Sequence, residues 1–146
     1  MTTTPTHTLP RVGDTAAPRT FGPLTRQMFV RYSGASGDLN PMHYDDGLAR
    51  SAGHPSVFSQ GMHQSALLAT FATDWLGADT IRRFGVRFRE QVWPDDVLTC
   101  EGTVTDVVRS PDGHLCVEVE LLCLRQTGAV AISGSATFHL DGGKLL

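Results

Sequence analysis

A short loop over residues 36–44, with the sequence SGDLNPMHY, holds the side chains best suited to proton transfer. Asp38 and His43 lie five residues apart with Asn40-Pro41 between them. Gly, Asp, Asn and Pro all favour turns, so Asn40 is expected to brace a rigid loop. A carboxylate and an imidazole held on such a loop can bind one water and move a proton. An isolated pair of this kind would more often be turn formers beside a half-buried histidine.

The longest apolar stretch, residues 60–76, begins with a second chemical feature. Its apolar residues cover most of a helical circumference, which predicts a helix buried on nearly all sides and ended by Gly77. The first N–H groups of a helix lack intrahelical partners and form the positive end of its dipole. Gly61 has no side chain, so its N–H is a candidate donor to a carbonyl oxygen that gains negative charge. From local sequence it is equally a helix-start glycine.

The remaining segments must position these groups. Thr25 is expected to cap a helix that runs to about Gly34, and a shorter helix is expected from Asp45 to about Arg50. After Gly77 the apolar period changes from 3.6 to 2, which predicts about four antiparallel strands. They are expected over residues 84–88, 97–108, 115–123 and 130–140, with Gly134 as a bulge. This order gives an α+β fold in which a curved sheet covers the long helix.

Length and composition exclude several classes of protein. The 146 residues suit one domain, over residues 12–146, after a mobile segment at 1–11. A net charge of −3 gives no field suited to nucleic acid, and no apolar run is long enough to span a membrane. Three cysteines without a CxxC pair, and six histidines without an HxxxH pair, predict reduced thiols and no metal site. A cytoplasmic location is therefore expected.

Residues 32–45, followed by Ala49 and by Gly61-Met62, resemble the signature of the MaoC-like dehydratases, which include the (R)-specific enoyl-CoA hydratases. The segment 87–94, RFREQVWP, resembles a later element of that family, whose Pro-Gly-Asp turn here is Pro94-Asp95-Asp96. The resemblance extends over about residues 12–140 and implies a hotdog fold, in which a curved sheet wraps a central helix.

The resemblance also implies a reaction and its residues. Asp38 and His43 would be a catalytic dyad that activates water, and the Gly61 N–H would bind a thioester oxygen. The reaction would interconvert trans-2-enoyl and (3R)-3-hydroxyacyl thioesters of coenzyme A or of an acyl carrier protein, with no metal or redox cofactor. Met62 is expected to shape the acyl pocket. Arg87 and Arg89 lie either on a solvated strand face or against the phosphates of the carrier.

Two other functions stay open at this point. The chain could be a non-catalytic hotdog subunit of a dehydratase complex, although it keeps both residues of the dyad. It could also be a hotdog thioesterase, but residues 60–73 lack the carboxylate that such an enzyme uses on its central helix. A single hotdog leaves a sheet edge open, so a homodimer or a heterodimer with a second hotdog chain is expected. The acyl group, the carrier and the physiological direction are not determined by the sequence.

Overall fold

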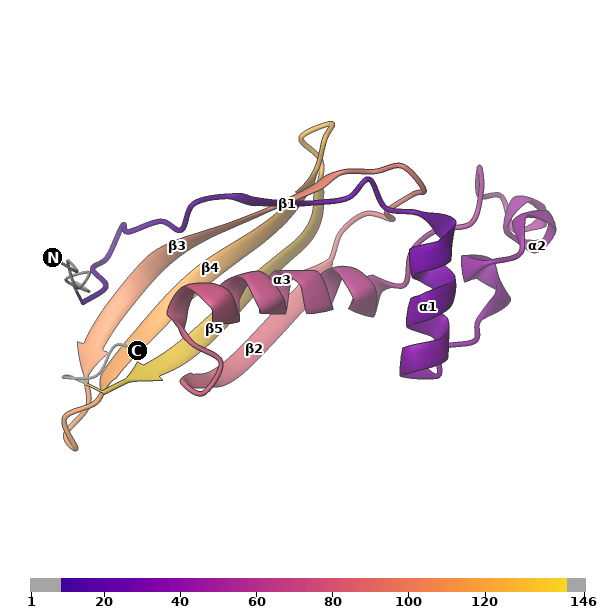
Figure 1. Ribbon diagram of the computed structural model, residues 1–146. Coiled ribbons are helices and arrows are strands. Elements are labelled where there is room, and N and C mark those ends of the chain that lie inside the picture. Colours follow the sequence, from indigo (N-terminus) through magenta and orange to yellow (C-terminus); the bar gives the residue numbers. More distant parts are fainter. Residues whose placement is uncertain (1–8, 142–146) are drawn as a thin grey trace, which may run out of the picture.

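A curved antiparallel sheet and one long helix form the body of the protein in the computed structural model, which describes residues 9–141 (Figure 1). The sheet has the strand order β1-β3-β4-β5-β2, and all neighbouring strands are antiparallel. Its strands are β1 (Arg19–Phe21), β2 (Ile81–Phe88), β3 (Leu98–Arg109), β4 (Leu115–Arg125) and β5 (Val130–Leu140). The helices are α1 (Arg26–Ser36), α2 (Asp46–Ser51) and α3 (Gly61–Leu76), with a 3₁₀ turn at Pro41–His43.

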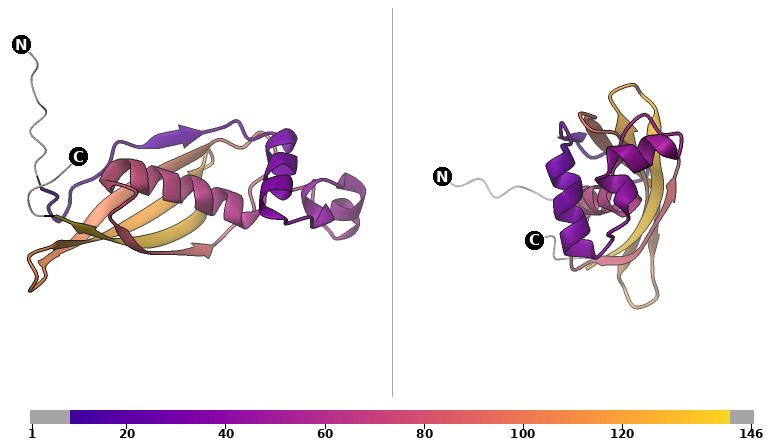
Figure 2. Two further views of the ribbon diagram at one scale, coloured as in Figure 1. Left: turned by 60° about the horizontal axis from the view of Figure 1, so that its bottom comes forward. Right: turned by 90° about the vertical axis from the view of Figure 1, so that its right-hand side faces the viewer.

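The core lies between α3 and the concave face of the sheet, which curves around the helix (Figure 2). The period-2 pattern of β4 buries every second residue from Leu115 to Cys123 against the helix. Leu68, Phe71 and Ala72 of α3 meet this face. Each large apolar side chain that is fully buried contributes about 1.5–3 kcal/mol to the stability of the folded state. The predicted α+β hotdog architecture is therefore confirmed, although one stripe of α3, from Met62 to Asp74, reaches the surface.

Two glycines allow elements to approach closely. At Gly102 of β3, a Cβ atom would lie 2.9 Å from the Trp75 ring of α3, so the missing side chain makes room for the indole. The prediction of a bulge at Gly134 is wrong, because this residue pairs in unbroken register with Val86 and Leu121. A Cβ there would lie 2.9 Å from the carbonyl oxygen of Gly85, so the glycine serves close strand packing instead.

The helices α1 and α2 lie beyond the N-terminal end of α3 (Figures 1 and 2). Thr25 caps α1 as predicted, in a capping box with Met28. The helix ends two residues later than predicted, at Ser36, because Gly37 adopts the left-handed conformation with φ +76°. Asp45 caps α2. This end of the molecule therefore carries the loop that contains Asp38 and His43.

The structure describes only part of the expected mobile segment and part of the expected domain. Residues 1–8 of the expected mobile segment, and 142–146 at the other end of the expected domain, lie outside the described residues. Among the helices that are described, none is both long and apolar enough to cross a membrane.

Candidate active site

Short-range hydrogen bonds hold the loop after α1 in one conformation. The Asp38 Oδ1 accepts from the backbone N–H of Asn40 at 3.3 Å, and the Asn40 Oδ1 accepts from the N–H of Met42 at 3.1 Å. Pro41 begins the 3₁₀ turn, where its lack of an N–H has no cost. Asn40 thus lies where a loop-bracing residue would lie, and the turn directs His43 into the protein.

His43 is 6% exposed and is held by Phe58. Its Nδ1 donates to the Phe58 carbonyl oxygen at 2.7 Å, and the Phe58 ring packs edge-on against the imidazole. With the proton on Nδ1, a neutral imidazole has a free lone pair on Nε2. Nε2 lies 3.5 Å from the Asp38 Oδ2, which is too long for a direct hydrogen bond. The Asp38 side chain is 46% exposed, so water reaches this pair of acceptors.

The start of α3 presents the backbone donor predicted from the sequence. The Gly61 N–H has no acceptor among residues 9–141. A Cβ at Gly61 would lie 3.0 Å from the Phe88 ring, so a side chain there would displace the aromatic ring. Because no described residue accepts a hydrogen bond from it, the N–H of Gly61 is a free donor at the positive end of a 16-residue helix.

Gln60 joins the two halves of the site. This fully buried side chain donates from Nε2 to the Phe29 carbonyl oxygen at 3.0 Å and to the Ser33 Oγ at 2.7 Å. Both partners belong to α1, which precedes the loop with Asp38, whereas Gln60 itself occupies the N-cap position of α3 without a side-chain capping hydrogen bond. Sequence reasoning placed Phe58 among the side chains that shape the pocket but missed its contact with His43, and it missed Gln60 altogether. The partners of both residues lie 15 or more positions away, so no local pattern marks these contacts.

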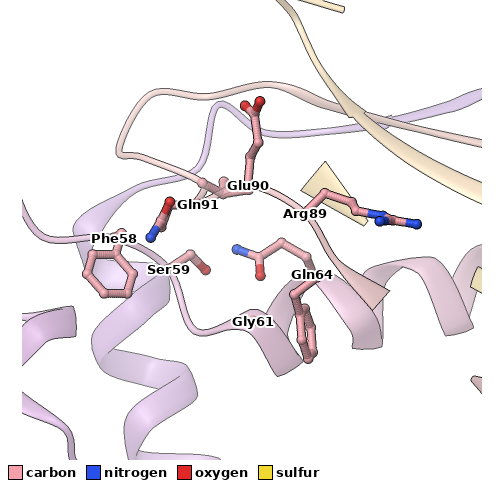
Figure 3. A pocket seen from close by; sticks show the side chains of 9 residues that line it. Phe58, Ser59, Gly61, Gln64, Arg89, Glu90 and Gln91 are labelled. Atoms are coloured by element: carbon pink, nitrogen blue, oxygen red, sulfur yellow. The ribbon is translucent and has the colours of Figure 1, made fainter. Parts of the chain in front are cut away.

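A cavity of about 220 Å³ opens at the start of α3 (Figure 3). Gly61 and Phe58 line it, and Phe58 also contacts His43, whereas Asp38, Asn40 and His43 themselves do not line it. Met62 does not line it and is 57% exposed, because it lies on the outward stripe of α3. The lining residues come from the segment before α3, the first turns of α3, the end of β2 and the segment after it: Phe58, Ser59, Gly61, Gln64, Phe88, Arg89, Glu90, Gln91 and Val92.

The two arginines proposed as phosphate contacts differ in position. Arg89 lines the cavity beside Gly61, and its Nε donates to the Ser133 Oγ at 3.1 Å. Arg87 instead lies in a groove of about 590 Å³ on the other face of the sheet, which Arg89 also lines. Glu118 and Glu120 line the same groove, so it carries both signs of charge. Within residues 9–141 no group of His, Cys, Asp or Glu is arranged to hold a metal ion.

Comparisons with known proteins identify the family to which the sequence is similar. A family model described as a MaoC like domain matches residues 8–123. Fatty acid synthase subunit beta of Gibberella zeae is 38% identical over 63 residues, which are 43% of this chain and 3% of that protein. The chain therefore corresponds to a small part of that much longer relative.

Solved structures match nearly the whole chain. The (R)-hydratase from A. caviae involved in PHA biosynthesis superimposes with a TM-score of 0.79 at 21% identity, over 90% of this chain and 97% of that one. The ChsH1-ChsH2 complex from Mycobacterium tuberculosis gives a TM-score of 0.79 at 19% identity, over 91% and 100%. At these identities the likeness shows the hotdog fold. Since the family model spans most of the sequence, the chain belongs to the MaoC-like dehydratase family.

Proposed function

We propose that the protein interconverts trans-2-enoyl thioesters and (3R)-3-hydroxyacyl thioesters, and that Asp38 and His43 activate the water. The observation that carries this proposal is the pair of free acceptors, His43 Nε2 and Asp38 Oδ2, at 3.5 Å. A water molecule has two protons and can donate one to each. Such a water is held as a nucleophile, and the free N–H of Gly61 lies three residues along the chain from Phe58, whose carbonyl oxygen holds His43.

In the hydration direction, His43 Nε2 takes one proton as the water oxygen bonds to C3 of the enoyl group. The electron pair of the double bond moves toward the thioester oxygen, and the Gly61 N–H stabilises the charge that develops there. The dyad then returns a proton to C2. Water is added in total, and the dyad ends in its starting protonation state. Because one dyad serves both carbons from one side, the addition is syn.

The remaining parts of the proposal concern the substrate and the partner. The acyl group is carried on coenzyme A or on the phosphopantetheine of a carrier protein, with Arg89 at the cavity beside Gly61 as a contact for the carrier. No metal or redox cofactor takes part. The protein works as a dimer, because β2 is an edge strand and carries the exposed ring of Phe88. The partner is a second copy or another hotdog chain, as the heteromeric ChsH1-ChsH2 relative suggests.

The test is loss of the enoyl-thioester absorbance when pure protein is added to crotonyl-CoA, to a longer trans-2-enoyl-CoA and to a crotonyl carrier protein. Light scattering on the same sample gives the oligomeric state. Hydration by the wild type and not by Asp38→Asn supports the proposal. Release of free thiol without hydration would indicate a thioesterase. Absence of both reactions, alone and with a co-purified second hotdog chain, would overturn the proposal.

A further inference from the structure

Two buried polar side chains at the start of α3, Ser59 and Gln64, have no part in the reaction proposed above. Each is 3% exposed, and they point toward one another at the wall of the cavity (Figure 3). In one orientation of the Gln64 amide, both its nitrogen and its oxygen have hydrogen-bond partners. Nε2 then donates to the carbonyl oxygens of Gln60 at 2.6 Å and Gly61 at 3.0 Å, and Oε1 accepts from the Ser59 Oγ at 2.9 Å.

The carbonyl of Gln60 and the N–H of Gly61 belong to the same planar peptide group. Gln64 therefore binds one end of the plane whose other end is the proposed donor to the thioester oxygen. The backbone N–H of His63 donates to the same carbonyl oxygen at 3.0 Å. Two donors on this oxygen restrict rotation of the peptide. They also polarise it, because a hydrogen bond to the carbonyl makes the N–H of the same amide a stronger donor.

Ser59 in turn orients the amide of Gln64. The single hydroxyl proton of Ser59 goes to Gln64, so the His63 Nδ1, 2.9 Å from the Ser59 Oγ, is the donor in that contact. Burial lowers the pKa of His63, and its ring stacks on Tyr32 with centroids 5.1 Å apart. A neutral, fixed imidazole therefore begins a chain of hydrogen bonds that runs through Ser59 and Gln64 to the carbonyl of Gln60.

We propose that Gln64 and Ser59 are positioning residues, which fix and polarise the Gln60–Gly61 peptide so that its N–H stabilises the charged thioester oxygen. This inference rests on the proposed function. Charge on that oxygen is greatest in the transition state, so the effect is expected in kcat more than in KM. Loss of an oxyanion donor itself costs about 100- to 1,000-fold in kcat, and loss of its support should cost less, on the order of 10-fold.

The experiment compares Gln64→Met, which keeps the length of the side chain without the amide, with Ser65→Ala. Ser65 is the next residue of α3, equally buried, and makes no hydrogen bond to the Gln60–Gly61 peptide among the described residues. The first readout is the amide resonance of Gly61 in ¹⁵N-labelled protein, free and with S-butyrylpantetheine. That probe is the unreactive arm common to both candidate carriers. The second readout is kcat and KM for hydration.

The expected result is that the probe shifts the Gly61 amide in wild type and in Ser65→Ala, and shifts it much less in Gln64→Met. Gln64→Met should lose about 10-fold in kcat with little change in KM. Ser59→Ala should follow Gln64→Met, and Ser59→Thr, which restores a hydroxyl, should recover part of the loss. A Gly61 amide that the probe leaves unmoved in wild type overturns the inference. So does a Gln64→Met protein with the Gly61 shift and kcat of wild type, or one whose loss Ser65→Ala reproduces.

The two proposals fail in different ways. If wild type shifts its Gly61 amide with the probe but hydrates no enoyl thioester, the proposed reaction is wrong. The positioning of the Gly61 N–H toward a thioester oxygen is then decided by the amide shifts of the variants alone.

Discussion

The imidazole of His43 donates through Nδ1 to the carbonyl oxygen of Phe58 at 2.7 Å. This bond determines which nitrogen of the ring is free, because a neutral imidazole has only one proton. Phe58 also lies three residues before Gly61 on the same short segment. One short stretch of backbone therefore both orients the proposed base and carries the proposed oxyanion donor.

The first prediction concerns the dyad. His43→Gln and Asp38→Asn should each lower kcat by two orders of magnitude or more, because each removes a group that would hold and deprotonate the water. Asp38→Asn keeps an oxygen that can accept from Asn40 N–H, and its side chain is half exposed, so the fold should persist. The measurements are turnover of the enoyl thioester and the thermal unfolding temperature.

His54→Gln is the matched control for His43→Gln. His54 also packs against the Phe58 ring, with centroids 4.8 Å apart, but among the described residues no carboxylate pairs with its imidazole as Asp38 does with His43. It should keep near wild-type turnover. If His43→Gln were as active as His54→Gln, His43 would not be the base.

Much of the site could be predicted because its chemistry is concentrated in one loop. Asp38, Asn40 and His43 lie close together in a loop that resembles the family signature, and this resemblance singles them out, although their catalytic roles stay predictions. Gln60 and Gln64 could not be found in this way. The partners of Gln60 lie 27 and 31 residues away in α1, and only the folded structure brings them together. The position of Met62 depends on which side of α3 the sheet covers, which its apolar pattern does not determine.

The elements of the fold were predictable to the extent that one face of each is apolar. The change of period after Gly77 predicts β2 to β5, and a run of apolar residues predicts α3. The strand β1 was missed because only three residues, Arg19–Phe21, pair with β3, too few for a visible alternation. Gly134 has the sequence appearance of a bulge, but its role depends on a neighbouring strand, since Gly85 approaches it across the sheet.

The second prediction concerns acid stability. Asp96 is 3% exposed and accepts from Arg125, from the N–H of Trp93 and from Gln126. Burial raises the pKa of Asp96, but these donors together outweigh it and hold the pKa below its usual value of 3.8. Because the folded-state pKa is the lower one, the stabilisation is fully present above about pH 4 and is lost as pH falls through the folded pKa.

Asp96→Asn should therefore destabilise the protein at pH 7 by about 3 kcal/mol, because it leaves Arg125 without its buried partner. The difference in the free energy of unfolding between wild type and Asp96→Asn should stay constant from pH 7 to about pH 4 and shrink as pH falls further, as measured by urea unfolding at each pH. Asp106→Asn removes an exposed carboxylate that has no arginine partner among the described residues, and it should change little at any pH. A constant difference between wild type and Asp96→Asn across this range would contradict the linkage.

The third prediction concerns the turn after β2, where the family has Pro-Gly-Asp and this chain has Pro94-Asp95-Asp96. Asp95 has φ +70°, a conformation that favours glycine, and it is exposed. Asp95→Gly should stabilise the protein by about 0.5–1 kcal/mol, since relief of strain exceeds the added freedom of the unfolded chain. Asp79→Gly, at a turn residue whose own φ is not positive, should not stabilise. The free energy of unfolding of both variants is measured with urea. If Asp95→Gly changed it no more favourably than Asp79→Gly, Asp95 would be unstrained.

The last prediction tests the contact between α3 and the sheet with a pair of identical substitutions. In Gly102→Ala, the added methyl would lie 2.9 Å from the Trp75 ring and 3.2 Å from both Leu121 and Phe71. Overpacking of this kind should cost about 1–3 kcal/mol. In Gly85→Ala, on β2, no heavy atom other than those of residue 85 and its two chain neighbours lies within 4 Å of the new methyl. That variant should be neutral or gain about 0.5 kcal/mol, because alanine loses less backbone freedom in a strand. Urea unfolding of both measures the difference, and a Gly102→Ala protein as stable as Gly85→Ala would mean that Trp75 does not pack tightly on β3.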